Sequence, residues 1–514
     1  MDWTAGYASD VEYVAGYYQE QSPSYLNFVC VLNGYQPVNL EQSFTYFELG
    51  FGRGLTVNVL AAANPQGQFY AADFNPAHVA GARELADQAG LNNLTLYEKS
   101  FAELAEDSQL DLPQFDFITL HGIYTWVTAE NQQHIVNFIT KYLKPGGIVY
   151  LSYNAMPGWA AVLPLQRFLV EYADAFPNRS NLQVEGAAAM IVKMEEAAAR
   201  YLLNHPSLKV RLEAIKSGNR NYLVHEYMHK HWAPRYHADI ARDLAAAKMD
   251  FVGSADLPFA YENLYLSEEK RALVDTMTEP AMRETMKDYF LNTSFRKDVF
   301  VRGARKLGSR KQTEALKQLG AVLIKPRSEV DLVFKLTIGE VNGKADLFNP
   351  VLDALERGPC AIDELMLIPE LQGQVIASLA QVIALLAASG AVRIYWKNLQ
   401  HQPAASAQAM NLAFANQTQY SDEYQIFASS VCGGGVSATY IERLTYLASR
   451  EPHAVFTPEA LAPRVWALVK GQGKNMLRDG KALETDEENL DEVLSQVRSL
   501  FETRLRVWEQ LKLR

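Results

Sequence analysis

A glycine-rich turn directly after an apolar strand pattern constrains this chain more than any other feature. The segment Phe44 to Leu49 has the composition of a buried strand and runs into Gly50-Phe51-Gly52-Arg53-Gly54. Glycines at alternate positions let the backbone bend sharply and let a ligand approach it closely. Residues 55–63 are apolar and predict a helix. The turn is therefore expected at a strand-to-helix connection, where α/β sheets bind ligands.

Strand and helix patterns alternate around this turn, from about residue 40 to residue 160. Further strands are predicted at residues 68–73, 94–98, 115–120 and 148–153. Asn75 followed by Pro76 provides a helix N-cap with proline at the first helical position. Strands that alternate with helices imply right-handed crossovers and a parallel sheet. The sequence therefore predicts an α/β, Rossmann-like domain.

The length of the chain predicts several domains. Its 514 residues correspond to roughly three or four domains of ordinary size. Residues 1–175 would form the α/β domain, with an aromatic N-terminal segment that is either an ordinary packed helix or a lid over a ligand. Residues 176–325 are predicted to be helical, 326–400 to resemble a winged helix, and 401–514 to be mostly helical. Residues 401–421 are rich in Ala, Gln and Asn and predict a linker or a loosely packed stretch.

Composition excludes several classes of protein. Cys30, Cys360 and Cys432 lie far apart without CxxC spacing, which excludes a disulfide scaffold and a thiolate zinc site. A net charge of −11 argues against a general nucleic-acid binder. The N-terminus lacks the basic-then-apolar order of a signal peptide. Residues 375–390 are the most apolar stretch and are too short to span a bilayer. A cytoplasmic protein without a membrane span is expected.

The charges around the turn indicate its ligand. Leu55 stands where a dinucleotide fingerprint has its third glycine, and no P-loop is present. Asp73 ends the second predicted strand, where a carboxylate suits ribose hydroxyls. Glu48 adds negative charge beside the turn, which repels phosphate and attracts a cation. S-adenosylmethionine has an adenosine, a sulfonium and an ammonium but no phosphate, so it is the predicted cofactor.

With the turn Lys144-Pro145-Gly146-Gly147 before the fifth strand, these motifs resemble class I S-adenosylmethionine-dependent methyltransferases. The resemblance implies that Ser100 and Phe101 flank the adenine. It also implies that His121 and Gly122, at the end of the fourth strand, lie near the methyl donor. The cofactor-binding residues expected from the motifs and the resemblance are Tyr18, Glu48, Gly50, Gly52, Gly54, Asp73, Phe74, Ser100, Phe101, His121 and Gly122.

Longer stretches are similar to a bacterial branch of these enzymes that carries a methyltransferase regulatory domain. They are residues 120–127 and 152–159. Residues 222–300 resemble the regulatory segment itself. Members of this branch include protein-lysine methyltransferases that act on bacterial outer-membrane proteins. The resemblance implies a protein substrate with a lysine acceptor, and the C-terminal half is expected to select the substrate or to form a homodimer. A small-molecule methyltransferase and a cofactor-binding regulatory scaffold without turnover are the alternatives.

Methyl transfer to lysine needs a neutral amine aligned with the methyl group. A free lysine is almost wholly protonated at neutral pH, so a desolvating aromatic slot beside the sulfonium is expected. The aromatic candidates for its walls are Tyr124, Trp126, Tyr153 and Trp159. Asn154 could accept a hydrogen bond from the amine, and His121 could either take a proton from a hydroxyl acceptor or stack near the cofactor. The catalytic candidates are His121, Tyr124, Trp126 and Asn154.

Two further motifs suggest other functions. His225-Glu226-Tyr227-Met228-His229 matches the HExxH pattern of zinc proteases, but Pro234 follows soon after and Arg235 occupies the position of a third ligand, so no metal is expected. The basic stretch 296–317 beside a winged-helix-like unit suggests nucleic-acid binding. However, the candidate recognition helix at 374–388 has no Lys or Arg, so no nucleic-acid partner is expected. An acidic protein partner or an ordinary solvated helix is the alternative for the basic stretch.

Overall fold

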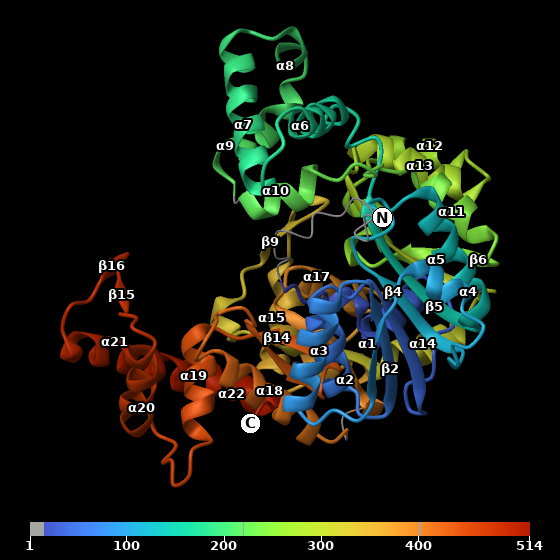
Figure 1. Ribbon diagram of the computed structural model, residues 1–514. Helices are drawn as coiled ribbons and strands as arrows, with labels where there is room; N and C mark the ends of the chain where they lie inside the picture. Colours follow the sequence, from blue (N-terminus) through green and yellow to red (C-terminus); the bar gives the residue numbers. More distant parts are fainter. Residues whose placement is uncertain (1–14, 219, 400–401) are drawn as a thin grey trace.

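The computed structural model describes residues 15–218, 220–399 and 402–514, and a central sheet organises it (Figure 1). The seven strands lie in the order β3-β2-β1-β4-β5-β7-β6, and β7 runs antiparallel to both of its neighbours. The strands are β1 (Phe44–Leu49), β2 (Gly67–Asp73), β3 (Leu94–Glu98), β4 (Phe115–Leu120), β5 (Leu143–Asn154), β6 (Met249–Ser254) and β7 (Phe295–Arg302). The predicted Rossmann-like α/β fold is confirmed.

Side chains that alternate along each strand give the sheet two apolar faces. Tyr46 and Phe117 belong to the core that contains α1, α2 and α3, whereas Phe47 and Ile118 belong to the core that contains α5 and α11. Because both faces are covered, most residues of the central parallel strands β1 and β4 are buried and apolar. The covering helices are α1 (Pro23–Leu32), α2 (Leu55–Ala63), α3 (Pro76–Gln88), α4 (Phe101–Glu106), α5 (Ala129–Tyr142) and α11 (His237–Ala245).

The strands β6 and β7 interrupt residues 176–325, which the sequence predicts to be mostly helical. β7 pairs with β5 from Val301 opposite Ile148 to Phe295 opposite Asn154. The charged residues at the start of β7 make the strand difficult to recognise from the sequence, because a buried strand normally lacks such residues. Here the charges are buried in ion pairs with neighbouring elements, and Asp298 has no exposed surface.

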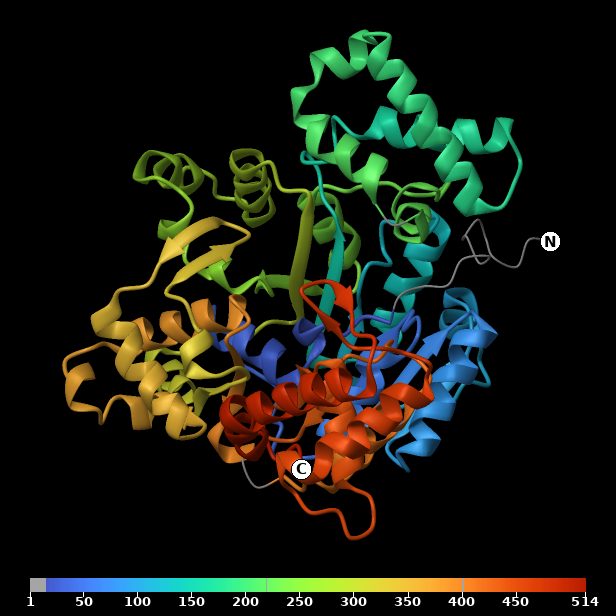
Figure 2. The ribbon, with the colours of Figure 1, turned by 90° about the vertical axis from the view of Figure 1, so that its left-hand side faces the viewer.

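Between β5 and β6 the chain forms a helical lobe, residues 163–227, that projects from the sheet (Figures 1 and 2). Its helices are α6 (Leu163–Ala175), α7 (Ser180–Glu196), α8 (Arg200–Asn204), α9 (Lys209–Ser217) and α10 (Arg220–Tyr227). They share an apolar core that includes Trp159, Leu169 and Ile191. The chain then returns along the end of β5, where the N–H of Arg235 donates to the carbonyl of Asn154 at 3.0 Å. After β6 follow α12 (Glu268–Asp275) and α13 (Pro280–Leu291).

Residues 319–396 form a small unit around a three-stranded sheet in the order β11-β8-β12. The candidate helix at 374–388 corresponds to α17, and the winged-helix interpretation stays a prediction. The elements, with the helix that precedes them, are α14 (Ser309–Gln318), β8 (Leu319–Leu323), β9 (Val333–Leu336), β10 (Gly339–Asn342), α15 (Ala345–Arg357), β11 (Cys360–Ala361), α16 (Ile362–Leu365), α17 (Ile376–Ala388) and β12 (Val392–Trp396).

The C-terminal region is mostly helical and lies beside α2 and α3 (Figure 1). The prediction of a loose stretch at 401–421 is wrong, because α18 packs against α2 with Met410 and Phe414 fully buried. Its polar Asn411 is also buried, and its amide exchanges hydrogen bonds with the backbone of Ala428. The elements are α18 (Ala405–Gln417), β13 (Ile426–Ser429), β14 (Gly434–Ser437), α19 (Tyr440–Ser449), α20 (Pro458–Gly471), β15 (Leu477–Arg478), β16 (Lys481–Ala482), α21 (Asp486–Ser499) and α22 (Leu505–Gln510).

The N-terminal aromatic segment and the possibility of a membrane span remain to be compared with the sequence predictions. The first 14 residues of the predicted aromatic lid lie outside the described residues, whereas Tyr17 and Tyr18 are described. Among the described helices, none combines the length and the apolar character that crossing a bilayer requires.

Candidate active site

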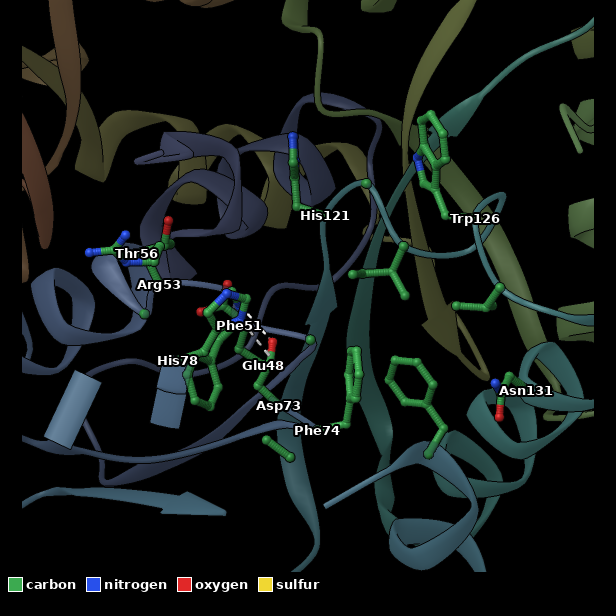
Figure 3. A pocket seen from close by; sticks show the side chains of 18 of the residues that line it. Glu48, Phe51, Arg53, Thr56, Asp73, Phe74, His78, His121, Trp126 and Asn131 are labelled. Atoms are coloured by element: carbon green, nitrogen blue, oxygen red, sulfur yellow. Dashed lines mark hydrogen bonds and ion pairs between the residues drawn. The ribbon is translucent and has the colours of Figure 1, made fainter. Parts of the chain in front are cut away.

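A cavity of about 930 Å³ opens at the carboxyl ends of β1, β2, β4 and β5. This volume lies near the upper end of the usual range for ligand pockets, about 300–1,000 Å³. Figure 3 shows Glu48 and Asp73 close together, with Trp126 on the opposite side of the cavity from Arg53 and Thr56. The structure brings all the predicted cofactor residues into the lining: Tyr18, Glu48, Gly50, Gly52, Gly54, Asp73, Phe74, Ser100, Phe101, His121 and Gly122.

The turn after β1 requires glycine for steric reasons. Gly50, Gly52 and Gly54 have φ values of +65°, +57° and +72°. Residues with a side chain rarely adopt this region. A Cβ atom on Gly50 would lie 2.7 Å from the Cδ1 atom of Ile123, inside van der Waals contact. The absence of side chains therefore keeps the backbone of the turn open toward the cavity.

Asp73 is held at the end of β2 by backbone donors. The N–H of Gly52 donates to its Oδ2 atom, and the N–H of Asn75 donates to its Oδ1 atom, both at 2.9 Å. The Nδ1 atom of His78 lies 3.3 Å from the same Oδ1. These contacts fix the carboxylate at the cavity wall and tie the glycine turn to β2. A carboxylate in this position suits the two hydroxyls of a ribose.

Glu48 presents a buried carboxyl oxygen that has no partner. Its Oε1 accepts a hydrogen bond from Gln21 at 3.2 Å, while its Oε2 has none among the described residues. Burial, together with the charge of Asp73, raises the pKa of Glu48 to about 8. The carboxyl group is therefore mainly protonated near neutral pH, which amends the expectation of a permanent negative charge beside the turn. An ammonium group at Oε2 would satisfy the oxygen and favour the ionised form.

His121 lies at the end of β4 and has a neutral ring. Tyr18 stacks on it with the ring centroids 3.6 Å apart, and its Nδ1 atom lies 2.9 Å from the hydroxyl of Tyr150. Burial lowers the pKa of His121 to about 3. Such a ring is a weak base, so His121 is poorly suited to take a proton from a hydroxyl acceptor. It also places no positive charge beside a cationic ligand.

The residues described so far form one half of the cavity. The second half lies at the ends of β4 and β5 and the start of β7. Asn154 is 5% exposed, and its Nδ2 atom has no partner among the described residues. Trp126 and Phe295 supply aromatic walls. The lining residues that sequence reasoning did not assign to the site include His225, Glu226 and His229. Their only signal in the sequence was the HExxH match.

Three aromatic residues predicted for the acceptor slot lie elsewhere. Tyr124 is buried outside the lining and donates its hydroxyl to Asp243 at 3.0 Å, so it is not assigned to the site. Tyr153 lies on the opposite face of β5 from Asn154, because neighbouring strand residues alternate. Trp159 is buried in the core of the helical lobe. Of the aromatic candidates, Trp126 lines the cavity.

The HExxH residues do not share a helix. α10 ends at Tyr227, so His229 lies beyond its end. Within the described ranges, no group of three or more His, Cys, Asp or Glu side chains is arranged to hold a metal ion.

A cavity with two carboxyl groups, one of which has an oxygen without a partner among the described residues, suits a cationic nucleoside. The mostly parallel seven-stranded sheet with flanking helices fits a class I methyltransferase. The protein is an S-adenosylmethionine-dependent methyltransferase. Residues 40–196 match the family described as "Methyltransferase domain", and residues 219–302 match the family described as "Predicted methyltransferase regulatory domain". The chain belongs to the family of methyltransferases that carry this regulatory domain.

One relative and one solved structure are similar to nearly the whole chain, and a further relative is similar to part of it. The chain is 38% identical over 493 residues to the uncharacterized protein sll1526 of Synechocystis sp., covering 96% of both proteins. It is 29% identical over 143 residues to a tRNA (guanine-N(7)-)-methyltransferase of Yersinia enterocolitica, covering 26% of this chain and 55% of that one. The structure of PKMT2 from Rickettsia typhi in complex with AdoHcy shares the fold with a TM-score of 0.68 and 17% identity, covering 97% of this chain and 99% of that one.

Cofactor binding is expected to release a proton through Glu48. Near neutral pH this carboxyl is mainly protonated in the free protein, because its pKa is about 8. A bound cation lowers that pKa, so binding should release close to one proton. Calorimetry of S-adenosylmethionine binding in buffers of different ionisation enthalpy measures this number. Glu48→Gln should abolish the release; an equal release from both proteins would contradict the assignment.

Proposed function

We propose that this methyltransferase transfers methyl groups to lysine side chains of a protein. The single observation that carries the proposal is the composition of the second half of the cavity. Trp126 and Phe295 provide aromatic walls and Glu226 provides a carboxylate. Such a lining suits an amine better than a phosphate or a carboxylate. The fold shared with PKMT2 and the resemblance to bacterial protein-lysine methyltransferases support the same acceptor.

The bound cofactor supplies an electrophilic methyl group on a sulfonium. The chain's own residues must then desolvate and orient the acceptor. Contact with Trp126 and Phe295 would exclude water from an entering amine, and desolvation lowers an amine pKa from about 10.4 toward neutrality. Asn154 would orient the acceptor by accepting a hydrogen bond from the amine through its Oδ1 atom, which leaves the amine lone pair free for the methyl group. Neutral His121 adds no like charge that would oppose entry of a cation.

Transfer of radioactive methyl groups to bacterial cell extract tests the proposal. The labelled macromolecules are hydrolysed and their amino acids separated, and label is expected in methylated lysine. Asp73→Ala serves as the control that should transfer no label. Label confined to a small metabolite would point to a small-molecule methyltransferase. Label in no product would point to a regulatory scaffold, and either result would overturn the proposed acceptor.

A further inference from the structure

The cavity is shared between two parts of the chain that are separate in the sequence. The predicted cofactor residues lie mainly at the ends of β1, β2 and β3, whereas the second half is closed by the end of α10 in the helical lobe. The segment after α10 runs along this half, because the N–H of Ala233 donates to the carbonyl of Thr125 at 2.8 Å and Arg235 pairs with Ala155. The lobe is therefore joined to the second half rather than to the glycine turn.

Glu226 is the acidic residue that α10 brings to this half of the cavity. Its side chain is 17% exposed, and its Oε1 lies 3.7 Å from the Nη1 of Arg211 on α9. That separation is too long for a hydrogen bond but short enough for an ion pair. Arg211 is itself held over the ring of Trp159, 4.2 Å from its centroid. The carboxylate of Glu226 is thus positioned by the packed core of the lobe.

Arg211 lies outside the cavity lining, and the lining groups around Glu226 in this half are neutral or aromatic. His229 is 4% exposed, and burial, followed by the nearby His225 and His231, lowers its pKa to about 4. The ring of Trp126 contacts that of His229 edge-on, 5.0 Å between centroids. Asn154 adds the buried Nδ2 atom that has no partner among the described residues. A carboxylate beside aromatic rings, with no lysine or arginine among the described lining residues of this half, favours an ammonium ligand.

We propose that Glu226 determines acceptor specificity, because its carboxylate binds the acceptor while it is an ammonium. The acceptor then gives its proton to solvent and enters between Trp126 and Phe295 as the neutral amine. This inference rests on the proposed function and adds that the helical lobe supplies part of the acceptor site. A hydroxyl acceptor of the same shape would gain much less from the carboxylate, since it carries no charge. The HExxH match in the sequence then reflects an acceptor site rather than a metal site.

Binding of n-butylamine, which has the shape of a lysine side chain, tests this without depending on turnover. Its affinity for the complex with S-adenosylhomocysteine is measured by saturation-transfer NMR, with n-butanol as the uncharged probe. Glu226→Gln should weaken n-butylamine binding about tenfold and leave n-butanol binding unchanged, as expected for loss of one charge-assisted contact. Glu226→Asp should retain part of the preference.

The matched control is Glu213→Gln, since Glu213 lies on α9 with its side chain 60% exposed and pairs with Lys216. This variant should bind both probes like the wild type. Equal n-butylamine affinity in the wild type and Glu226→Gln, or no preference of the wild type for the amine, overturns the inference. Methylated lysine in the labelling experiment would leave the proposed function standing in that case, so the two failures can be told apart.

Discussion

Replacing Asp73 by alanine is expected to weaken binding of S-adenosylmethionine at least about 100-fold. The carboxylate accepts hydrogen bonds from the N–H groups of Gly52 and Asn75 and is only 6% exposed. Its loss would remove two charge-assisted bonds to a ribose, each worth about 1.5–3 kcal/mol. It would also remove the hydrogen bond from Gly52, although the N–H of Gly50 would still hold the turn to β2 through the carbonyl of Ala72 at 2.8 Å. Since about 1.4 kcal/mol corresponds to a tenfold change, a loss of 100-fold or more follows.

Isothermal titration calorimetry of the wild type and Asp73→Ala measures this effect. The matched control is Asp87→Ala, because Asp87 is exposed near the end of α3. The control should bind with wild-type affinity, and circular dichroism should show that both variants are folded. Asp73→Asn should fall between the two, since it keeps the shape but not the charge. A folded Asp73→Ala protein with unchanged affinity would remove Asp73 from the cofactor site.

Asp298→Ala is expected to destabilise the fold more than any surface substitution. The carboxylate is completely buried on β7 and lies 3.0 Å from the guanidinium of Arg296 and 2.8 Å from the Nδ1 of His237. The hydroxyl of Tyr153 on β5 donates to it at 2.7 Å. Burial opposes the charge of Asp298, but Arg296 and His237 outweigh it and lower its pKa. Removing one partner of a buried ion pair costs about 3–5 kcal/mol.

Urea unfolding followed by circular dichroism measures the free energy of the transition that includes the central sheet. The matched control is Asp275→Ala, because Asp275 also pairs with an arginine, Arg283 at 2.8 Å, but is 67% exposed. Exposed pairs contribute about 0–1 kcal/mol, so the control should unfold nearly like the wild type. Equal stability of the two variants would show that the buried cluster does not hold β7 in the sheet.

Local sequence signals predicted the cofactor half of the cavity. The run Phe44 to Leu49 is apolar and ends in glycines, so β1 lies where it was predicted. Asn75 caps α3 as expected, with its side chain accepting from the N–H of Ala77. The glycine turn and Asp73 are close in sequence and in space, which is why their joint placement could be inferred without a structure.

The acceptor half could not be predicted in this way. Asn154 and Glu226 are far apart in the sequence. They line the same cavity because the chain that follows the helical lobe runs back along the end of β5. The strand β7 was missed because Arg296 and Asp298 neutralise each other inside the protein, which a pattern of polar residues does not reveal. The raised pKa of Glu48 likewise results from burial, a property of the tertiary structure.

A crystal structure of the protein with S-adenosylhomocysteine tests the central claim most directly. We predict that the ribose lies at Asp73 and the amino group at Glu48, with the sulfur facing the half of the cavity lined by Trp126, Asn154 and Glu226. An adenosine bound instead among Trp126 and Glu226, or a ligand outside this cavity, would contradict the division of the site into a cofactor half and an acceptor half.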